Sequence, residues 1–195
     1  MMNLKDYNVI KESVGVLIGL PTRAMFRSVD MLCLSFGDLI EVEREDFYRR
    51  KDGKLARRKK RTKVLVGKYS LHFQCFYRIV AGTEMVLAKE DRFQPSSKIA
   101  SEDHDSFFEN SKYTKRGNNV LDENIALLQE GGLDDFVVKG ITVNRLGDLK
   151  ITFTNGFRLE SMSDWTTDDE CWRFFESGQL DAPHLVVGSE GIMEG

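Results

Sequence analysis

The segment Leu71-His-Phe-Gln-Cys-Phe-Tyr-Arg-Ile-Val80 organises the chain, because a version of it returns late in the sequence. The late segment, Glu170-Cys-Trp-Arg-Phe-Phe175, places Trp172-Arg173-Phe174 where the first places Tyr77-Arg78-Ile79. An apolar run and then a glutamate follow each triplet: Met85-Val86-Leu87-Ala88 with Glu90, and Leu185-Val186-Val187-Gly188 with Glu190. Similar residues in the same order at two places indicate an internal duplication.

Residues 71–80 have the pattern of a β-strand that is covered on both faces. Successive residues of a strand point to opposite faces, so Phe73 and Tyr77 share one face while His72 and Phe76 share the other. Both faces therefore carry bulky side chains. The sequence predicts one continuous central strand over residues 71–80.

Each copy is expected to contain four short strands. In the first copy these are residues 29–36, 39–42 after a Gly37-Asp38 turn, 71–80 and 84–89. In the second copy they are residues 149–154, 157–160 after an Asn155-Gly156 hairpin turn, the segment around Trp172, and 185–187. In this alignment a basic insertion, residues 43–63, separates the second and third strands of the first copy. The second copy has only the loop 161–167 at that place.

Short helices are expected near the N-terminus and in the segment 92–136, where the polar part 92–119 has room for a further helical turn. Residues 6–20 predict a short helix that runs into a strand at 14–18, and Gly19-Leu20-Pro21 then forms a turn. Residues 92–136 predict a polar linker and a short helix that has Asp122 as its N-cap and Gly131-Gly132 at its end.

These patterns predict a mainly β protein of the α+β class. We expect antiparallel sheets from two pseudo-repeated four-stranded units, with one or two short helices. The chain of 195 residues suits a single globular domain, 1–195. Its pseudo-repeat halves, about 19–91 and 137–192, are joined by the linker and short helix of residues 92–136.

The composition is that of an ordinary soluble protein, with 41% hydrophobic and 30% charged residues and a net charge of −3. The apolar run Val14–Leu20 is too short to span a membrane, and no targeting pattern precedes it. Cys33, Cys75 and Cys171 are odd in number and widely spaced, which predicts reduced, buried thiols. We therefore expect a cytoplasmic protein.

The charges are distributed unevenly along the chain. From residue 160 onward Arg173 is the only Lys or Arg, whereas the stretch 49–63 contains ten of them and a single acid, Asp52. The candidate binding residues in this stretch are Arg49, Arg50, Lys54, Arg57, Arg58, Lys59, Lys60 and Arg61. Such a run suits contact with nucleic acid or with an acidic protein surface, and a solvated hairpin tip is the alternative.

No pattern in the sequence indicates a metal site, a cofactor or a catalytic group. His72 and Cys75 lie three residues apart on the expected strand, so they point to opposite faces and cannot hold one ion. Nucleotide-binding glycine motifs and Gly-x-Ser-x-Gly are absent from the sequence. The sequence favours a non-enzymatic protein, with an unrecognised enzyme as an alternative.

Arg78 and Arg173 occupy equivalent places in the two copies. Each lies among large apolar side chains, and a buried guanidinium needs a carboxylate or several carbonyl partners. We interpret both as buried arginine clamps that pair with Glu90 and Glu190. A pair of symmetric anion-binding arginines is the alternative.

Four segments of the chain resemble an uncharacterised bacterial protein family: residues 31–37, 67–78, 147–149 and 170–175. Members of that family have a Phe-Gly strand end, a Leu-His strand that ends in an aromatic-Arg pair, and a late Trp-Arg pair. The resemblance spans about residues 19–187, and the basic insertion is its variable part. Genes of this kind lie near polymorphic toxin systems, so the resemblance implies an immunity or partner-binding role. No functional residue can be carried over from it.

Together these observations predict a non-enzymatic, cytoplasmic binding protein, of an immunity type that occludes a protein partner. The alternative is a binder of nucleic acid or of acidic surfaces through residues 49–63.

Overall fold

The computed structural model describes residues 2–49, 55–164, 166–167, 169–178 and 183–193. For residues 44–49 and 55–60 it describes the backbone alone. The candidate residues Arg50 and Lys54 therefore lie outside the described residues. The side chains of Arg49, Arg57, Arg58, Lys59 and Lys60 lie outside them too, and Arg61 is described completely.

The protein is mainly β, as predicted, with 46% of residues in strands and 25% in helices. Its described residues form two antiparallel sheets. The six-stranded sheet has the order β1-β2-β3-β9-β10-β11 and consists of Thr22–Ser28, Met31–Arg49, Leu55–Phe73, Glu170–Glu176, Leu185–Gly188 and Gly191–Ile192. The five-stranded sheet has the order β5-β4-β8-β7-β6 and consists of Glu84–Ala88, Phe76–Ala81, Phe157–Met162, Leu149–Phe153 and Val138–Val143.

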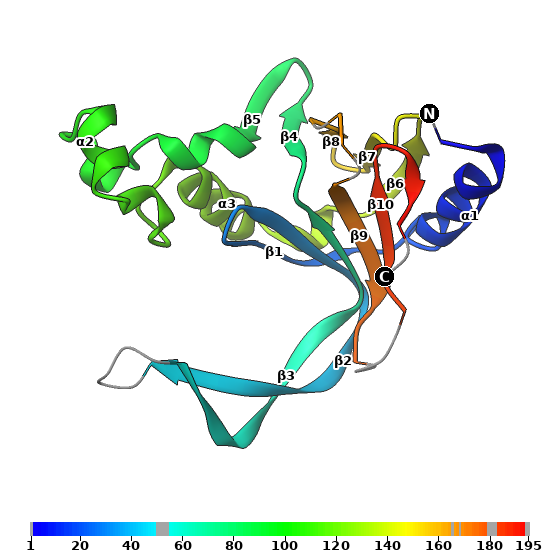
Figure 1. Ribbon diagram of the computed structural model, residues 1–195, viewed down its shortest axis with the longest axis horizontal. Helices are drawn as coiled ribbons and strands as arrows, with labels where there is room; N and C mark the ends of the chain where they lie inside the picture. The colour runs from blue at the N-terminus through cyan, green and yellow to red at the C-terminus, as the bar shows by residue number, and fades with distance from the viewer. Residues whose placement is uncertain (1, 50–54, 165, 168, 179–182, 194–195) are drawn as a thin grey trace.

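Three α-helices lie at the periphery of the sheets in the described chain (Figure 1): α1 Leu4–Gly15, α2 His104–Glu109 and α3 Val120–Glu130. Four 3-10 helices connect elements: η1 Lys89–Phe93, η2 Ser97–Ile99, η3 Lys112–Thr114 and η4 Leu133–Asp135.

Two details of the predicted helices were wrong. The expected strand at 14–18 is the end of α1 and a following turn, because Ile10, Val14 and Leu17 recur at helical spacing and are all buried. The N-cap of α3 is Asn119, whose Oδ1 accepts a hydrogen bond of 2.8 Å from the backbone N–H of Asp122. Asp122 lies in the first turn of the helix and has a different role.

The duplication is visible in the order of the strands, although each copy has five strands rather than the expected four, because β1 and β6 were not predicted. Strands β1 to β5 correspond in order to strands β6 to β10. Exchanging each strand for its counterpart converts the order β1-β2-β3-β9-β10 of one sheet into β6-β7-β8-β4-β5, which is the order of the other sheet. The correspondence also includes the helix before each set, since α1 precedes β1 and α3 precedes β6. Strands β4 and β9, which carry Tyr77-Arg78 and Trp172-Arg173, thus occupy corresponding positions. Tyr77 and Trp172 are both completely buried.

The expected continuous strand 71–80 is wrong, because the chain passes from one sheet to the other within it. Strand β3 ends at Phe73 in the six-stranded sheet, and β4 begins at Phe76 in the five-stranded sheet. The backbone N–H groups of Gln74 and Cys75 both donate to the carbonyl of Cys171, at 2.8 and 2.9 Å. The crossover is therefore fixed to β9. Residues 71–80 carry bulky side chains on both faces because this segment contains the end of one strand and the start of another.

The position predicted for the basic insertion is also wrong. Residues 39–42 continue β2 after a bulge, and β3 is the true counterpart of β8. The insertion therefore lies within the β2–β3 hairpin, and its counterpart in the second copy is the tight Asn155-Gly156 turn between β7 and β8. We call the two paired segments Leu39–Arg49 and Leu55–Gly67 the ribbon.

The ribbon extends away from the two sheets (Figure 1). Strand β1 pairs with β2 only as far as Phe36, and β9 pairs with β3 only from Tyr69 onward, so within the described part of the chain the ribbon strands pair only with each other. The bulge contains Gly37, whose φ is +82°. A Cβ atom on the facing Gly67 would lie 2.6 Å from the backbone N of Phe36. Two glycines thus permit the bulge at which the ribbon leaves the sheet.

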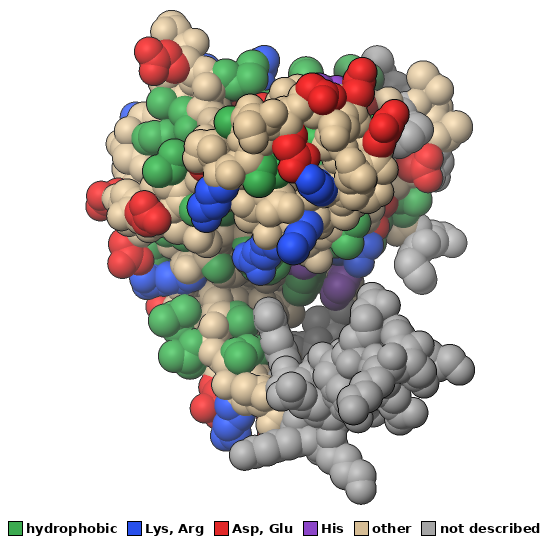
Figure 2. Space-filling view, turned by 90° about the vertical axis from the view of Figure 1, so that its left-hand side faces the viewer, with side chains coloured by type: hydrophobic (Ala, Val, Ile, Leu, Met, Phe, Trp, Pro, Cys, Tyr) green, Lys and Arg blue, Asp and Glu red, His purple; other side chains and the backbone are tan. Residues whose placement is uncertain are grey.

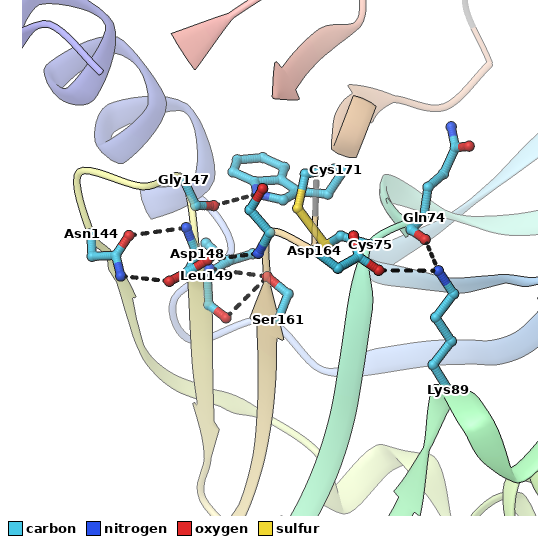
Figure 3. Close-up of a disulfide and its surroundings, with 12 residues drawn as sticks. Gln74, Cys75, Lys89, Asn144, Gly147, Asp148, Leu149, Ser161, Asp164 and Cys171 are labelled. Carbon is cyan, nitrogen blue, oxygen red and sulfur yellow. Dashed lines mark hydrogen bonds and ion pairs between the residues drawn. A yellow bond between two sulfur atoms is a disulfide. The ribbon is translucent and has the colours of Figure 1, made fainter. Parts of the chain in front are cut away.

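The expected reduced state of all three cysteines is contradicted, because Cys75 and Cys171 form a disulfide (Figure 3). Their Cα atoms are 4.5 Å apart, and the two residues are separated by 96 positions in the sequence. Wide sequence spacing gave no sign of this bond, because the crossover at residues 74–75 brings Cys75 against β9. Cys33 is free and buried, as expected.

Reducing this disulfide should lower the free energy of unfolding by about 2–5 kcal/mol, because a cross-link over a long loop restricts the unfolded chain. Denaturant unfolding with and without dithiothreitol measures the difference. A Cys171→Ala variant is the control, since its unfolding should not respond to dithiothreitol. Equal unfolding midpoints for the oxidised and reduced wild-type protein would show that the bond contributes no stability.

Candidate functional site

The candidate site is a groove at the root of the ribbon, with a volume of about 680 Å³. It lies beside the first residues of β1, where the ribbon begins and where β9 ends. Its lining includes Arg23, Phe26, Ser35, Leu39, Leu65 and Phe175. Figure 2 shows hydrophobic, basic and acidic side chains close together on the described part of the chain that leads from the body to the ribbon.

Ser35 gives this groove a buried polar group without a partner. The residue is 6% exposed, and its Oγ atom has no hydrogen-bond partner among the described residues. Its cross-strand neighbour Ser70 is satisfied, because the hydroxyls of Ser70 and Ser177 are 2.9 Å apart. An unpaired buried hydroxyl costs free energy, so its presence beside an open groove is informative.

Three aromatic rings follow one another beside the groove. The ring of His72 meets the edge of Phe175 at 5.0 Å between centroids, and His184 stacks on Phe175 at 4.2 Å. His72 and Phe175 line the groove, and His184 is exposed. From the sequence, His72 was considered only as a metal ligand, because its contact with Phe175 depends on the pairing of β3 with β9.

Both signs of charge occur at the ribbon root. Lys63 Nζ lies 2.6 Å from Glu41 Oε1, and Arg61 lies 3.2 Å from Glu43 Oε2. On the opposite wall, Arg23 donates to the Gly37 carbonyl at 2.9 Å and to Asp134 at 2.7 Å. Of the predicted basic residues, Arg61 is thus the one whose side chain is placed at this groove.

Arg78 and Arg173 form ion pairs, although not with the expected partners. Arg78 binds Glu160, its cross-strand neighbour, through Nε at 2.9 Å and Nη2 at 2.8 Å. Arg173 makes a bidentate pair with Glu170 on its own strand. The proposed pairing with Glu90 and Glu190 is therefore wrong, because strand register places Glu160 beside Arg78 and Arg173 pairs within its own strand. The two side chains are 37% and 31% exposed, so neither clamp is fully buried.

A buried ion pair that sequence reasoning missed joins β1 to α3. Arg27 binds Asp122 through Nε at 2.8 Å and Nη2 at 2.7 Å, and the two side chains are 5% and 7% exposed. Burial by itself would raise the pKa of Asp122. Hydrogen bonds from Arg27, from the backbone of Gly117 and from Asn119 together outweigh it and lower that pKa.

The described side chains do not form a catalytic arrangement like those considered above. No group of three or more His, Cys, Asp or Glu in this part of the chain could hold a metal ion. Burial raises the pKa of the Cys33 thiol to about 11, which disfavours the thiolate needed by a nucleophile. Cys75 and Cys171 form the disulfide and therefore provide no free thiol. A buried ammonium beside it, that of Lys89, donates to the Gln74 carbonyl and lies 3.7 Å from Asp164 (Figure 3).

Comparisons with known proteins found no relative. No family model matches the chain, and neither a curated protein nor a solved structure is significantly similar to it. Among the described residues, no helix is both long and apolar enough to cross a membrane.

Replacing Asp122 with Asn should lower the free energy of unfolding by about 3–5 kcal/mol at neutral pH, because Arg27 would stay buried without a counterion. The pKa of Asp122 is lower in the folded than in the unfolded state, so its ionised form contributes stability above about pH 4. That contribution is lost as the pH falls through the folded-state pKa. The gap in stability between the wild type and Asp122→Asn should therefore narrow on acidification.

Denaturant unfolding between neutral and acidic pH measures this gap. Asp134→Asn is the matched control, since Asp134 pairs with Arg23 but its side chain is 82% exposed. That variant should change the stability by no more than about 1 kcal/mol. A gap for Asp122→Asn that stays constant with pH would contradict the assigned role.

Proposed function

We propose that this chain is a non-enzymatic binding protein that holds an acidic protein partner with the ribbon and the groove at its root. The observation that carries the proposal is the ribbon itself, whose strands pair only with each other beyond Phe36 and Tyr69. An isolated two-stranded ribbon is marginally stable in water, so it contributes little to the fold. Contact with another molecule best explains why the protein has a ribbon that its fold does not need.

The second copy supports this view, because it has the same strands without a ribbon. There β7 and β8 are joined directly through Asn155-Gly156, and the corresponding sheet positions are filled. The scaffold therefore does not require the ribbon. The stretch 49–63 carries ten Lys and Arg against one Asp, so electrostatic attraction favours an acidic partner and speeds the encounter with it.

The ribbon root favours a protein as that partner. Glu41 and Glu43 form ion pairs there with cations of the facing strand, and Leu39 and Leu65 are 52% and 65% exposed. Apolar side chains with a mixed polar rim are usual at protein–protein interfaces, whereas surfaces that bind phosphates are strongly positive. The resemblance to a family found near toxin systems is consistent with an immunity-type protein that occludes its partner.

A cytoplasmic location forms part of this proposal, as it does for immunity proteins that meet their toxins inside the cell. The expectation of reduced cysteines no longer supports that location. Disulfides persist mainly in oxidising compartments, and Cys75–Cys171 is one.

Nucleic acid is the second candidate partner. The cations at residues 57–61 follow one another without interruption, and phosphate contacts need many cations. The exposed ring of His184, stacked on Phe175, also offers a surface on which a base could stack.

A ribbon deletion tests the main proposal. Glu43 and Lys63 are direct cross-strand partners, so replacing residues 44–62 with Asn-Gly should close a short hairpin like that of the second copy. We expect an almost unchanged melting temperature, because the removed strands pair only with each other, and a loss of binding to poly-L-glutamate. Fluorescence anisotropy with labelled poly-L-glutamate and with labelled duplex DNA measures binding.

Matched charge variants provide the control. Changing Arg57, Arg58, Lys59 and Lys60 to Gln removes four cations, and so does changing the exposed Lys5, Lys11, Lys115 and Arg116 of the body. The ribbon variant should bind poly-L-glutamate about tenfold more weakly or worse, and the body variant nearly as well as wild type. Equal losses would contradict a specific role for the ribbon. Binding to DNA alone would replace the main proposal with the second candidate.

A further inference from the structure

The groove at the ribbon root has the size and lining of an anchor pocket. Its volume of about 680 Å³ falls within the range of about 300–1,000 Å³ that is usual for ligand pockets. Its wall combines the rings of Phe26 and Phe175 with the aliphatic side chains of Leu39 and Leu65. It can therefore surround a large apolar side chain.

The two leucines are exposed without any structural need for them. Leu39 faces Gly67, and Leu65 faces Glu41 two residues further along, so the leucines are diagonal neighbours on one face of the ribbon. Neither belongs to the buried core. Such an apolar pair beside an open groove has the character of a contact site rather than of a solvated surface.

Ser35 supplies an independent sign of an occupant. Its hydroxyl is buried in the wall of the same groove and has no partner among the described residues. Buried polar groups are nearly always paired in folded proteins, so an unpaired one at a groove fits a hydrogen bond that a bound molecule completes.

The charges decide which kind of molecule this is. The groove opens at the root of a ribbon whose stretch 49–63 has ten cations and one acid. An occupant that continues along the ribbon must be acidic. Within the groove the two carboxylates of Glu41 and Glu43 are matched by two arginines of the lining, so the wall itself suits an uncharged side chain rather than a phosphate.

We infer that the groove receives an aromatic or other large apolar side chain from an acidic segment of a partner protein, with Ser35 hydrogen-bonded to that segment. This inference rests on the proposed function and adds the chemistry of the partner. Leu39, Leu65 and Phe175 contact the anchor side chain, and the ribbon cations bind the acidic residues around it. Binding energy in such interfaces is concentrated in one buried anchor of this kind.

Two labelled polymers of matched length test the inference: poly-L-glutamate, and a random copolymer of glutamate and tyrosine. The copolymer carries fewer charges, so charge attraction alone would make it the weaker ligand. We expect it to bind the wild-type protein about tenfold more tightly, because it can place an aromatic ring in the groove. A Leu39→Ala, Leu65→Ala double variant should lose this preference and keep its affinity for poly-L-glutamate. Leu4→Ala, Leu127→Ala is the matched control, since both residues are 59% exposed and lie on helices.

Ser35→Ala separates a binding role from a structural one. Removing an unpaired buried hydroxyl should leave the melting temperature unchanged or raise it, while affinity for the copolymer falls. A lower melting temperature with unchanged affinity would assign the hydroxyl a structural role and overturn its part in binding.

The outcomes also distinguish this inference from the proposed function. If both polymers bind through the ribbon cations but the leucine variant keeps the wild-type preference, the groove is not an anchor site and the proposed function stands. If neither polymer binds, the proposed function fails as well. A third outcome is that the copolymer does not bind, whereas labelled single-stranded DNA binds the wild type and loses affinity in the leucine variant. The occupant of the groove is then a nucleic acid, and the inference is wrong.

Discussion

Neither half of the chain can bury its own strands alone, because each half contributes three strands to one sheet and a hairpin to the other. Strand β3 of the first half pairs with β9 of the second, and β8 of the second half pairs with β4 of the first. Residues at corresponding positions of the two halves contact each other where the halves pack together. The bridge between Pro21 and Val137 joins the entrances of β1 and β6, and the disulfide joins the start of β4 to β9. Contacts between equivalent places are what two-fold symmetry produces, and they hold the two sheets around one core.

The near-symmetry of the scaffold makes its one large asymmetry informative. Both halves have a hairpin at corresponding places, but only the first extends it into a ribbon. Two glycines, Gly37 and Gly67, permit the bulge between the sheet and the ribbon. The groove, with the unpaired hydroxyl of Ser35, lies at this junction. The features that the core does not require are thus collected at one place, which is why a binding role is assigned there.

Much of the architecture could be predicted from short-range patterns. Alternation identified β7, Asn155-Gly156 identified a hairpin, and the repeated aromatic-Arg pairs indicated equivalent strands, whereas β1 and β6 were not predicted. The errors concern what local patterns do not encode. A strand that changes sheet at Gln74 has the same alternation as one that does not, so the break in 71–80 was missed. The partners of Arg78, Arg173 and Arg27 depend on register and on helix packing, and the Cys75–Cys171 bond depends on the crossover.

The candidate site was harder to predict than the fold. The cationic stretch was evident in the sequence, and its outer side chains lie beyond the described residues. The groove consists of residues from β1, β2, β3 and β9, which no motif connects. Leu39 and Leu65 look like ordinary strand residues until the pairing places them beyond β1 and β9. Ser35 has no distinguishing neighbour in the sequence, because only the packed structure shows that its hydroxyl is buried and unpaired.

The interlocked hairpins also determine when the protein can fold during synthesis. After β2 to β5 leave the ribosome, β3 and β4 have no neighbours on their outer edges until β8 and β9 follow. The residues that form the disulfide are 96 positions apart, which corresponds to about 5–20 s of translation. During that interval the nascent chain exposes apolar strands with unpaired backbone groups, a state that is prone to non-native association. Strands of both halves must be made before either sheet is complete, so these edges stay open until the later strands arrive.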